Sequence, residues 1–317
     1  MSARVIAVVV TNNRKGLLRE CLDAVLTQTH PVTEVIVVNN ASADGTREML
    51  DTDYADKVNR IHMAHNVGGA GGFYRGMKWA CDRGADWLWL MDDDGLPQKD
   101  ALARMMTPEN VEDYDLMNSL VVNRENSGEL CFLLPDKDGL TKSVKELLAF
   151  QKGAPVIQGT INPFNGTLIG RITIGKIGYT KREMFIWGDE VDYYDRVKDA
   201  GLRFGTVIGS RHLHPTKKKS DVEIGFLGGT LLLAPPSAAN IYARNLGYRA
   251  VRRRSASYCL VKPATYVLYF LTKGQFKTAG NFLAYWIDGL FDLYRLTPSR
   301  KDLLSKSDDF LLAEVKQ

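Results

Sequence analysis

The feature that most constrains the fold is a regular alternation of apolar runs and amphipathic segments in the first 95 residues. Apolar, largely β-branched runs predict buried strands at 5–10, 35–38, 58–63 and 87–91. Between them, apolar residues recur at helical spacing over 17–28, from 46 to 50 and from about 72 to 81. Strands alternating with helices predict a doubly wound α/β sheet that binds ligands at the carboxyl ends of its strands.

The rest of the chain changes character at about residue 236. Before that point the pattern predicts strands at 165–169 and 204–208, a helix at 194–200 and a polar loop at 216–223. From residue 237 onward the pattern is helical and amphipathic, with aromatic residues among the bases. We therefore expect an α/β domain over 1–236 and a C-terminal helical region over 237–317.

Basic residues are concentrated in that C-terminal region. The whole chain carries a net charge of only +4, which argues against a nucleic-acid partner. Residues 241–317, however, hold 13 Lys and Arg against 6 Asp and Glu. Basic, aromatic-rich helices favour contact with an anionic membrane surface. A helical cap or a homo-oligomer interface is the alternative.

Cysteine spacing and hydropathy bear on the compartment. The four cysteines lie far apart in the sequence and have no metal-ligand spacing, which is typical of free thiols in a reducing compartment. The sequence shows no secretory signal pattern and no apolar run of about 18 residues. We expect a cytoplasmic protein, peripheral at the inner face of the cell membrane.

Three consecutive carboxylates, Asp92, Asp93 and Asp94, follow the predicted strand at 87–91. They repel one another unless a cation neutralises them. A divalent cation with oxygen ligands would do so and would leave positions for a diphosphate. The spacing does not fit an EF-hand loop. A solvated turn or a helix cap is the alternative.

A glycine cluster at 65–72 follows the third predicted strand. It lacks the G-x-G-x-x-G pattern, because the sixth position from Gly69 is Tyr74, and this argues against a nicotinamide enzyme. The glycines would let the backbone approach a ligand closely and let a helix begin beneath it. A flexible loop is the alternative.

Several motifs occur in a fixed order. They are Val8-Val-Val-Thr-Asn-Asn-Arg14, Val37-Val-Asn-Asn-Ala-Ser-Ala-Asp-Gly-Thr46, His65-Asn-Val-Gly-Gly and Asp92-Asp-Asp94. This order resembles the nucleotide-sugar half of an inverting family 2 glycosyltransferase. The resemblance implies the GT-A fold, a Rossmann-like, mixed and mainly parallel sheet flanked by helices. Pro163-Phe-Asn-Gly-Thr167, the segment 185–193 and His212-Leu-His-Pro215 are similar to the galactofuranosyltransferase and rhamnosyltransferase branch.

The resemblance, which covers residues 4–215, implies a donor site at the first loops. The residues it places beside the nucleotide sugar are Thr11, Asn13, Arg14, Asn39, Asn66, Gly68 and Gly69. The family usually has Asp at position 39, where this chain has Asn. Asp92 and Asp94 would hold Mn²⁺ or Mg²⁺ on the diphosphate, with Asp93 beside the sugar.

The resemblance also implies a base and a further metal ligand. An inverting transfer needs a base that reaches the acceptor hydroxyl. The family's acidic pair maps to Asp189 and Glu190, of which Glu190 is favoured. Trp187 would stack on a sugar. A histidine commonly completes the metal shell, and both His212 and His214 qualify, with His214 favoured. An acidic helix N-terminus, a core tryptophan and a metal-free histidine are the structural alternatives.

The sequence thus predicts a metal-dependent, inverting hexosyltransferase of cell-surface glycan synthesis. The expected donor is UDP-galactofuranose, with dTDP-rhamnose as the alternative. The expected acceptor is a lipid-linked or polysaccharide glycan. A nucleotidyltransferase would also use acidic metal ligands on an α/β sheet, and a non-catalytic glycan-assembly scaffold could retain the same fold.

Overall fold

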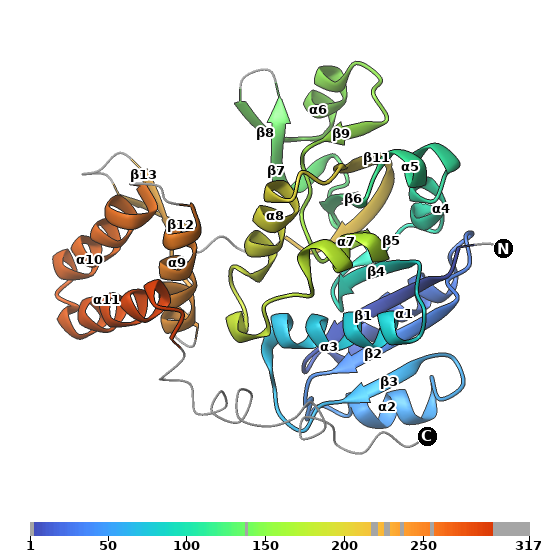
Figure 1. The fold of residues 1–317 in the computed structure, drawn as a ribbon, viewed down its shortest axis with the longest axis horizontal. Coiled ribbons are helices and arrows are strands. Elements are labelled where there is room, and N and C mark those ends of the chain that lie inside the picture. Colours follow the sequence, from blue (N-terminus) through green and yellow to red (C-terminus); the bar gives the residue numbers. More distant parts are fainter. Residues whose placement is uncertain are drawn as a thin grey trace. The chain divides into compact units, whose positions relative to one another are not determined.

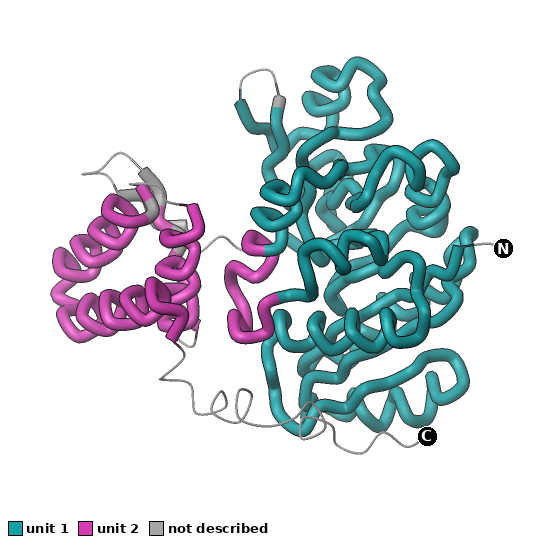
Figure 2. Tube along the Cα trace, viewed as in Figure 1, with its two compact units in different colours: residues 1–180, 193–216, 307–317 teal, residues 181–192, 217–306 magenta. Residues whose placement is uncertain are grey.

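The computed structural model describes residues 3–136, 139–216, 221–224, 229–234, 238–253 and 257–293. These residues form two compact units (Figure 2). The first contains the described residues up to 180 together with 193–216. The second contains residues 181–192 and the described residues from 221 onward. This division differs from the expected boundary at 236, because residues 181–192 and the described residues from 221 to 234 belong to the second unit.

Four parallel strands form one half of the sheet in the first unit, in the order β3-β2-β1-β4 (Figure 1). They are β1 (Val5–Thr11), β2 (Glu34–Asn39), β3 (Asn59–His62) and β4 (Trp87–Asp92). The helices that follow the first three strands are α1 (Lys15–Leu26), α2 (Thr46–Thr52) and α3 (Gly68–Asp82). The predicted alternation of strand and helix is confirmed.

Helices cover both faces of β1, which explains its uninterrupted β-branched sequence. Successive strand residues point to opposite faces. Val5, Ala7 and Val9 share one core cluster with the apolar face of α1. On the other face, a Cβ at Gly72 or at Gly76 of α3 would lie 2.5 Å from Val10 or 2.3 Å from Val8. The α3 glycines therefore bring the helix backbone close to the strand.

The remaining strands complete a mixed, mainly parallel sheet. Its order continues from β4 to β10, β6, β11 and β5, and β10 runs antiparallel to both of its neighbours. Off this path, β7 pairs with β6 and β8, and β9 pairs with β11. The strands after β4 are β5 (Leu96–Pro97), β6 (Leu116–Asn123), β7 (Glu129–Asp136), β8 (Gly139–Ser143), β9 (Val156–Gln158), β10 (Asn165–Gly170) and β11 (Phe204–His214). The intervening helices are α4 (Ala101–Met105), α5 (Pro108–Asp113), α6 (Val144–Gln151), α7 (Arg171–Ile177) and α8 (Asp189–Asp199).

The second unit contains a helical cluster. Its helices are α9 (Ala239–Arg253), a π-helical turn (Ser257–Val261), α10 (Lys262–Thr272) and α11 (Phe276–Leu290). The same unit also contains a hairpin of β12 (Asp221–Ile224) and β13 (Gly229–Leu232) and a 3₁₀ turn at Arg182–Met184. Tyr266 and Phe282 stack in its core, with ring centroids 4.7 Å apart. The predicted C-terminal helices are confirmed. Within the described residues, none of the helices is long and apolar enough to cross a membrane.

Several predicted boundaries differ from the structure. Helix α3 begins at Gly68 rather than near 72, because its close packing on β1 compensates for the low helix propensity of glycine. Helix α8 begins at Asp189 rather than 194, since acids favour the first turn of a helix. The predicted strand at 204–208 extends to His214. Of the predicted loop at 216–223, residues 217–220 lie outside the described residues, and 221–223 belong to β12. All four cysteines are free.

Candidate active site

Three loops lie next to one another at the carboxyl ends of β1, β2 and β4. The ladders pair Thr11 with Asn39 and Val10 with Asp92, so the three strands end at one edge of the sheet. The loop after β1 is tied to the loop after β2. The backbone N–H of Asn13 donates to Ser42 Oγ (2.9 Å), and the backbone N–H of Lys15 donates to Asp44 Oδ2 (2.8 Å). These two hydrogen bonds fix the backbone that leads from β1 into α1.

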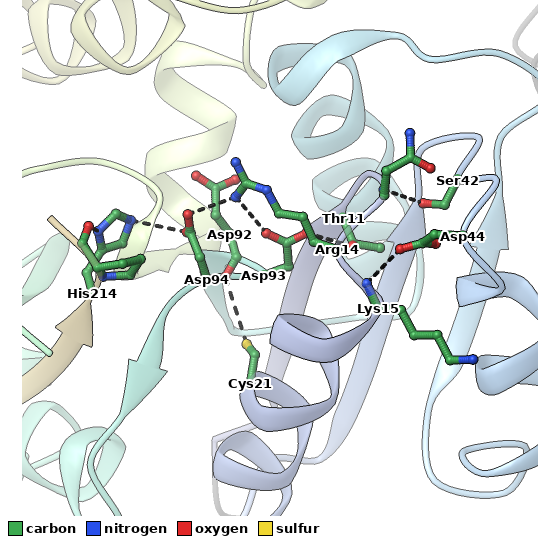
Figure 3. A network of polar contacts seen from close by, with 12 residues as sticks. Thr11, Arg14, Lys15, Cys21, Ser42, Asp44, Asp92, Asp93, Asp94 and His214 are labelled. Atoms are coloured by element: carbon green, nitrogen blue, oxygen red, sulfur yellow. Dashed lines mark hydrogen bonds and ion pairs between the residues drawn. The ribbon is translucent and has the colours of Figure 1, made fainter. Parts of the chain in front are cut away.

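The carboxylates after β4 form a network with the β1 loop (Figure 3). Thr11 Oγ1 donates to Asp93 Oδ2 at 2.6 Å. Arg14 Nη1 lies 3.1 Å from Asp93 Oδ1 and 2.8 Å from Asp94 Oδ2, so one guanidinium bridges both acids and offsets part of their negative charge. Asp93 is 2% exposed and both of its oxygens are engaged. The structure thus gives Thr11 and Asp93 a bond to each other, whereas the sequence analysis assigned both to the nucleotide sugar.

The charges of this network are strongly coupled. Burial raises the pKa of Asp93, and its bonds with Thr11 and Arg14 only partly offset that effect. Burial would lower the pKa of Arg14, but the charges of Asp93 and Asp94 outweigh it and raise that pKa. An arginine stays protonated in either case, and the cluster therefore holds a fixed positive charge beside the acids.

The structure separates the two histidines that the sequence left as alternatives. His214 Nε2 lies 3.1 Å from Asp94 Oδ1, and Nδ1 lies 2.8 Å from the carbonyl oxygen of Pro215 (Figure 3). Burial would lower the pKa of His214, but the hydrogen bond to Asp94 outweighs it and raises the pKa to about 9. His214 is therefore a cation facing Asp94 in the unliganded protein.

His212 occupies a different environment. It is fully buried, and burial lowers its pKa to about 3, so the ring is neutral. A Cβ at Gly95 would lie 2.0 Å from its Nε2, and one at Gly166 would lie 2.8 Å from its Nδ1. Gly95 and Gly166 thus pack closely against the ring, and within the described residues neither ring nitrogen has a hydrogen-bond partner. A metal-binding role for His212 stays a prediction, whereas His214 is the histidine that contacts Asp94.

Asn39, at the expected nucleobase position, is held within the protein. Its Oδ1 accepts from the backbone N–H of Ser42 at 3.1 Å, and its Nδ2 lies 3.0 Å from His62 Nδ1. Burial lowers the pKa of His62, so the ring is neutral and its Nδ1 accepts the amide N–H. His62 Nε2 in turn lies 3.2 Å from Asp51. The amide orientation of Asn39 is therefore fixed before any ligand binds.

The glycine-rich segment is positioned by an asparagine that the sequence analysis did not single out. Buried Asn40 donates to the carbonyl oxygen of Gly68 (2.9 Å) and accepts from the backbone N–H of Val67 (2.8 Å). Exposed Asn66 accepts from the backbone N–H of Gly68 at 2.8 Å. A Cβ at Gly69 would meet open space within 4 Å. The pair Asn39-Asn40 at the end of β2 was the feature of the sequence that could have indicated this role.

The second acidic cluster belongs to the second unit. Asp189 is 6% exposed, whereas Glu190 is half-buried and its Oε2 accepts from the backbone N–H of Gly188 at 3.1 Å. Trp187 has φ +65° and its ring meets Tyr242 edge to face, with centroids 6.4 Å apart. Trp187 is half-buried, so part of its ring is exposed.

Asp92, Asp94 and His214 have the chemistry that a divalent cation requires of its ligands. In the described ranges, no three His, Cys, Asp or Glu side chains already stand in a metal-binding arrangement. Asp92 and Asp94 nevertheless offer carboxylate oxygens, and the Nδ1 bond of His214 to a backbone carbonyl directs Nε2 toward Asp94. A histidine that ligates a metal characteristically has its other nitrogen bound in this way. Oxygen and imidazole ligands suit Mn²⁺, and oxygen ligands suit Mg²⁺.

Comparison with known proteins identifies relatives. The model of the family "Glycosyl transferase family 2" matches residues 6–133. Galactofuranosyltransferase GlfT1 of Mycolicibacterium smegmatis is 34% identical over 216 residues, which cover 67% of this chain and 70% of the relative. Galactofuranosyltransferase GlfT1 of Mycobacterium tuberculosis is 36% identical over 220 residues, covering 68% and 71%.

A solved structure supports the same fold. The crystal structure of GalNAc-T7 with UDP, GalNAc and Mn²⁺ superposes with a TM-score of 0.54 at 14% identity, covering 80% of this chain and 52% of that one. At this identity the likeness concerns the fold alone. The predicted GT-A architecture is confirmed.

Proposed function

This chain belongs to glycosyltransferase family 2, and from that premise we propose that it transfers galactofuranose from UDP-galactofuranose to a glycan acceptor with inversion. The observation that carries the proposal is the triplet of carboxylates at the end of β4, faced by Arg14 and His214. The proposed donor follows from the similarity to two galactofuranosyltransferases.

The donor site supplies charge compensation for a diphosphate. Asp92, Asp94 and His214 would hold Mn²⁺ or Mg²⁺, which would act as a Lewis acid on the departing nucleoside diphosphate. Arg14 is already positioned at the carboxylates, and its guanidinium can pair with phosphate oxygens. Asn39, at the expected nucleobase position, is buried and bonded to Ser42 and His62, so its support for the donor site is to fix the loop after β2.

The acceptor site supplies a base. We assign that role to Glu190, whose carboxylate takes the proton from the acceptor hydroxyl as that oxygen attacks the anomeric carbon. The bond between the anomeric carbon and the diphosphate oxygen breaks as the new glycosidic bond forms. Asp189, which is more buried, supports the first turn of α8.

A donor panel tests the proposal. UDP-galactofuranose, UDP-galactopyranose and dTDP-rhamnose are incubated with protein and Mn²⁺, and release of the nucleoside diphosphate is measured. We expect turnover of UDP-galactofuranose above the others. Turnover of dTDP-rhamnose alone would assign a rhamnosyltransferase, and pyrophosphate release from a nucleoside triphosphate would assign a nucleotidyltransferase. Nucleotide binding without any turnover would support a scaffold.

We further propose that α10 and α11 rest on the cytoplasmic face of a membrane, where a lipid-linked glycan acceptor would reside. Helix α11 buries Ala279 and Phe282 in its own unit yet exposes a second apolar stripe at helical spacing. The stripe comprises Phe276, Leu283 and Ile287 of α11 and Phe291 at its C-cap, which are 39–71% exposed. Lys277 lies on the same helix, and an apolar stripe together with basic residues is typical of helices that lie in the headgroup region.

Flotation with lipid vesicles tests this placement. The wild-type protein is expected to float with vesicles that contain anionic phosphatidylglycerol. Replacing Phe276 and Ile287 together with Glu should weaken partitioning by about 10²-fold or more, because each large apolar side chain contributes roughly 1.5–3 kcal/mol when buried. Ile172→Glu, at a 72%-exposed position of the first unit, is the matched control and should still float. The proposed membrane contact is wrong if the double variant floats as well as the wild-type protein, or if the wild-type protein does not float.

A further inference from the structure

Residues 181–192, which carry Trp187, Asp189 and Glu190, belong to the same compact unit as the C-terminal helices (Figure 2). Their backbone has an uncommon conformation. Phe185 has φ +66° and ψ −66°, Trp187 has φ +65°, and Gly188 has φ +124°. Residues other than glycine rarely adopt positive φ, and each such residue costs about 1–3 kcal/mol. This segment therefore requires bonds from its surroundings to keep its shape.

One side chain of α9 supplies those bonds. Asn245 is 2% exposed, and its Nδ2 lies 3.0 Å from the carbonyl oxygen of Met184, 2.9 Å from that of Ile186 and 3.0 Å from that of Trp187. The two amide hydrogens are thus shared among three carbonyls. These carbonyls flank both non-glycine residues with positive φ, so a single amide holds the strained backbone.

Arg244 fixes the orientation of that amide. Its Nη2 donates to Asn245 Oδ1 at 2.7 Å, which directs the Nδ2 of Asn245 toward the segment. The same Nη2 lies 3.1 Å from the carbonyl oxygens of both Glu183 and Met184. Arg244 is 4% exposed, and burying a charged side chain is costly unless its bonds are satisfied. The buried guanidinium thus contacts both the Asn245 side chain and the backbone of residues 183–184.

Helix α9 is itself held rigidly against α11. A Cβ at Gly289 would lie 1.9 Å from the carbonyl oxygen of Arg244, and one at Gly247 would lie 2.0 Å from that of Trp286. The two helix backbones therefore touch at the level of Arg244 and Asn245. The acidic segment is thus attached to a rigid helix pair, and within that segment the backbone N–H of Gly188 donates to the side-chain Oε2 of Glu190 at 3.1 Å.

We propose that Asn245, oriented by Arg244, is a positioning residue that sets the conformation of residues 184–188 and thereby the orientation of Glu190. The inference rests on the proposed function, in which Glu190 is the base. It gives the C-terminal helices a role in catalysis beyond membrane contact. Misplacing a catalytic group by about 1 Å costs on the order of 10²-fold in rate.

The discriminating variant is Asn245→Asp. It preserves the size of the side chain and the oxygen that accepts from Arg244, but it replaces the N–H donors with an oxygen facing three carbonyls. The matched control is Asn240→Asp, the same change at a half-exposed position of the same helix. If Asn245→Asp does not fold, Asn245→Ser, which keeps one hydrogen-bond donor, takes its place in the experiment.

We expect kcat for transfer to fall about 10²-fold in Asn245→Asp and less in Asn245→Ser. UDP affinity should stay unchanged, as should the activity of Asn240→Asp.

A double-mutant cycle with Glu190→Gln separates positioning from a general structural defect. If Asn245 acts through Glu190, Asn245→Asp lowers kcat by less than about 3-fold in the Glu190→Gln background, because the effects are then non-additive. An equal loss in both backgrounds, or full activity of Asn245→Asp, overturns the inference. Full activity of Glu190→Gln alone instead overturns the base assignment of the proposed function, so the two failures are distinguishable.

Discussion

Asp94→Asn is expected to lower the rate of sugar transfer by about 10³-fold while the protein remains folded. Asp94 is 3% exposed and faces two cations, with Arg14 Nη1 at 2.8 Å and His214 Nε2 at 3.1 Å. An amide has nearly the same shape but no charge, so it can neither hold these cations nor bind a divalent metal well. Removing one preorganised group that stabilises transition-state charge costs roughly 10²–10³-fold, and loss of a metal ligand costs at least as much.

Initial rates of UDP release from UDP-galactofuranose, together with circular dichroism, measure this effect. Asp56→Asn, the same change at an exposed position of the first unit, is the control and should retain wild-type activity. A rate for Asp94→Asn within about 3-fold of the wild-type rate would rule out the assigned site. If Asp94→Asn does not fold, Asp92→Asn is measured instead, because Asp92 is only half-buried in the wild-type protein.

Glu190→Gln should lower kcat for transfer by about 10²–10⁴-fold without weakening UDP binding. Glutamine retains an oxygen that can accept from Gly188 but cannot take a proton from the acceptor hydroxyl. The loss should therefore appear in the chemical step. Stopped assays at saturating donor, with UDP affinity measured separately, distinguish these two quantities.

Asp199→Asn, an exposed acid at the other end of α8, is the matched control for this variant. Asp189→Asn tests the alternative base. Loss of transfer in Asp189→Asn with full activity in Glu190→Gln would move the base to Asp189. Full activity in both variants would remove the base from this segment altogether.

The sequence predicted the parallel half of the sheet because its signals are local. The run from Val5 to Val10 is apolar throughout since helices cover both faces of β1, and the alternation of strands and helices indicated parallel pairing. The acid triplet was recognisable for a similar reason, since three carboxylates at the end of an apolar strand stand out without any tertiary information.

Other features depend on contacts between distant residues. The sequence could not show which of His212 and His214 contacts Asp94, because that contact joins residues far apart in the chain. The bond of Thr11 to Asp93 joins residues 82 positions apart. The role of Asn245 was equally hidden, because a buried asparagine in an amphipathic helix carries no local signal for the carbonyls it binds about 60 residues earlier. The start of α3 was misplaced because glycine propensity opposes a helix that packing stabilises.

We propose that the carboxylates after β4 bind a nucleoside diphosphate together with a divalent cation. Isothermal titration of UDP into the wild-type protein and into Asp94→Asn, each with and without Mn²⁺, tests this binding. We expect Mn²⁺ to strengthen UDP binding to the wild-type protein at least about 10-fold and to leave UDP binding to Asp94→Asn unchanged, because metal and diphosphate would share one site. Equal UDP affinity in all four titrations would rule out such a shared site.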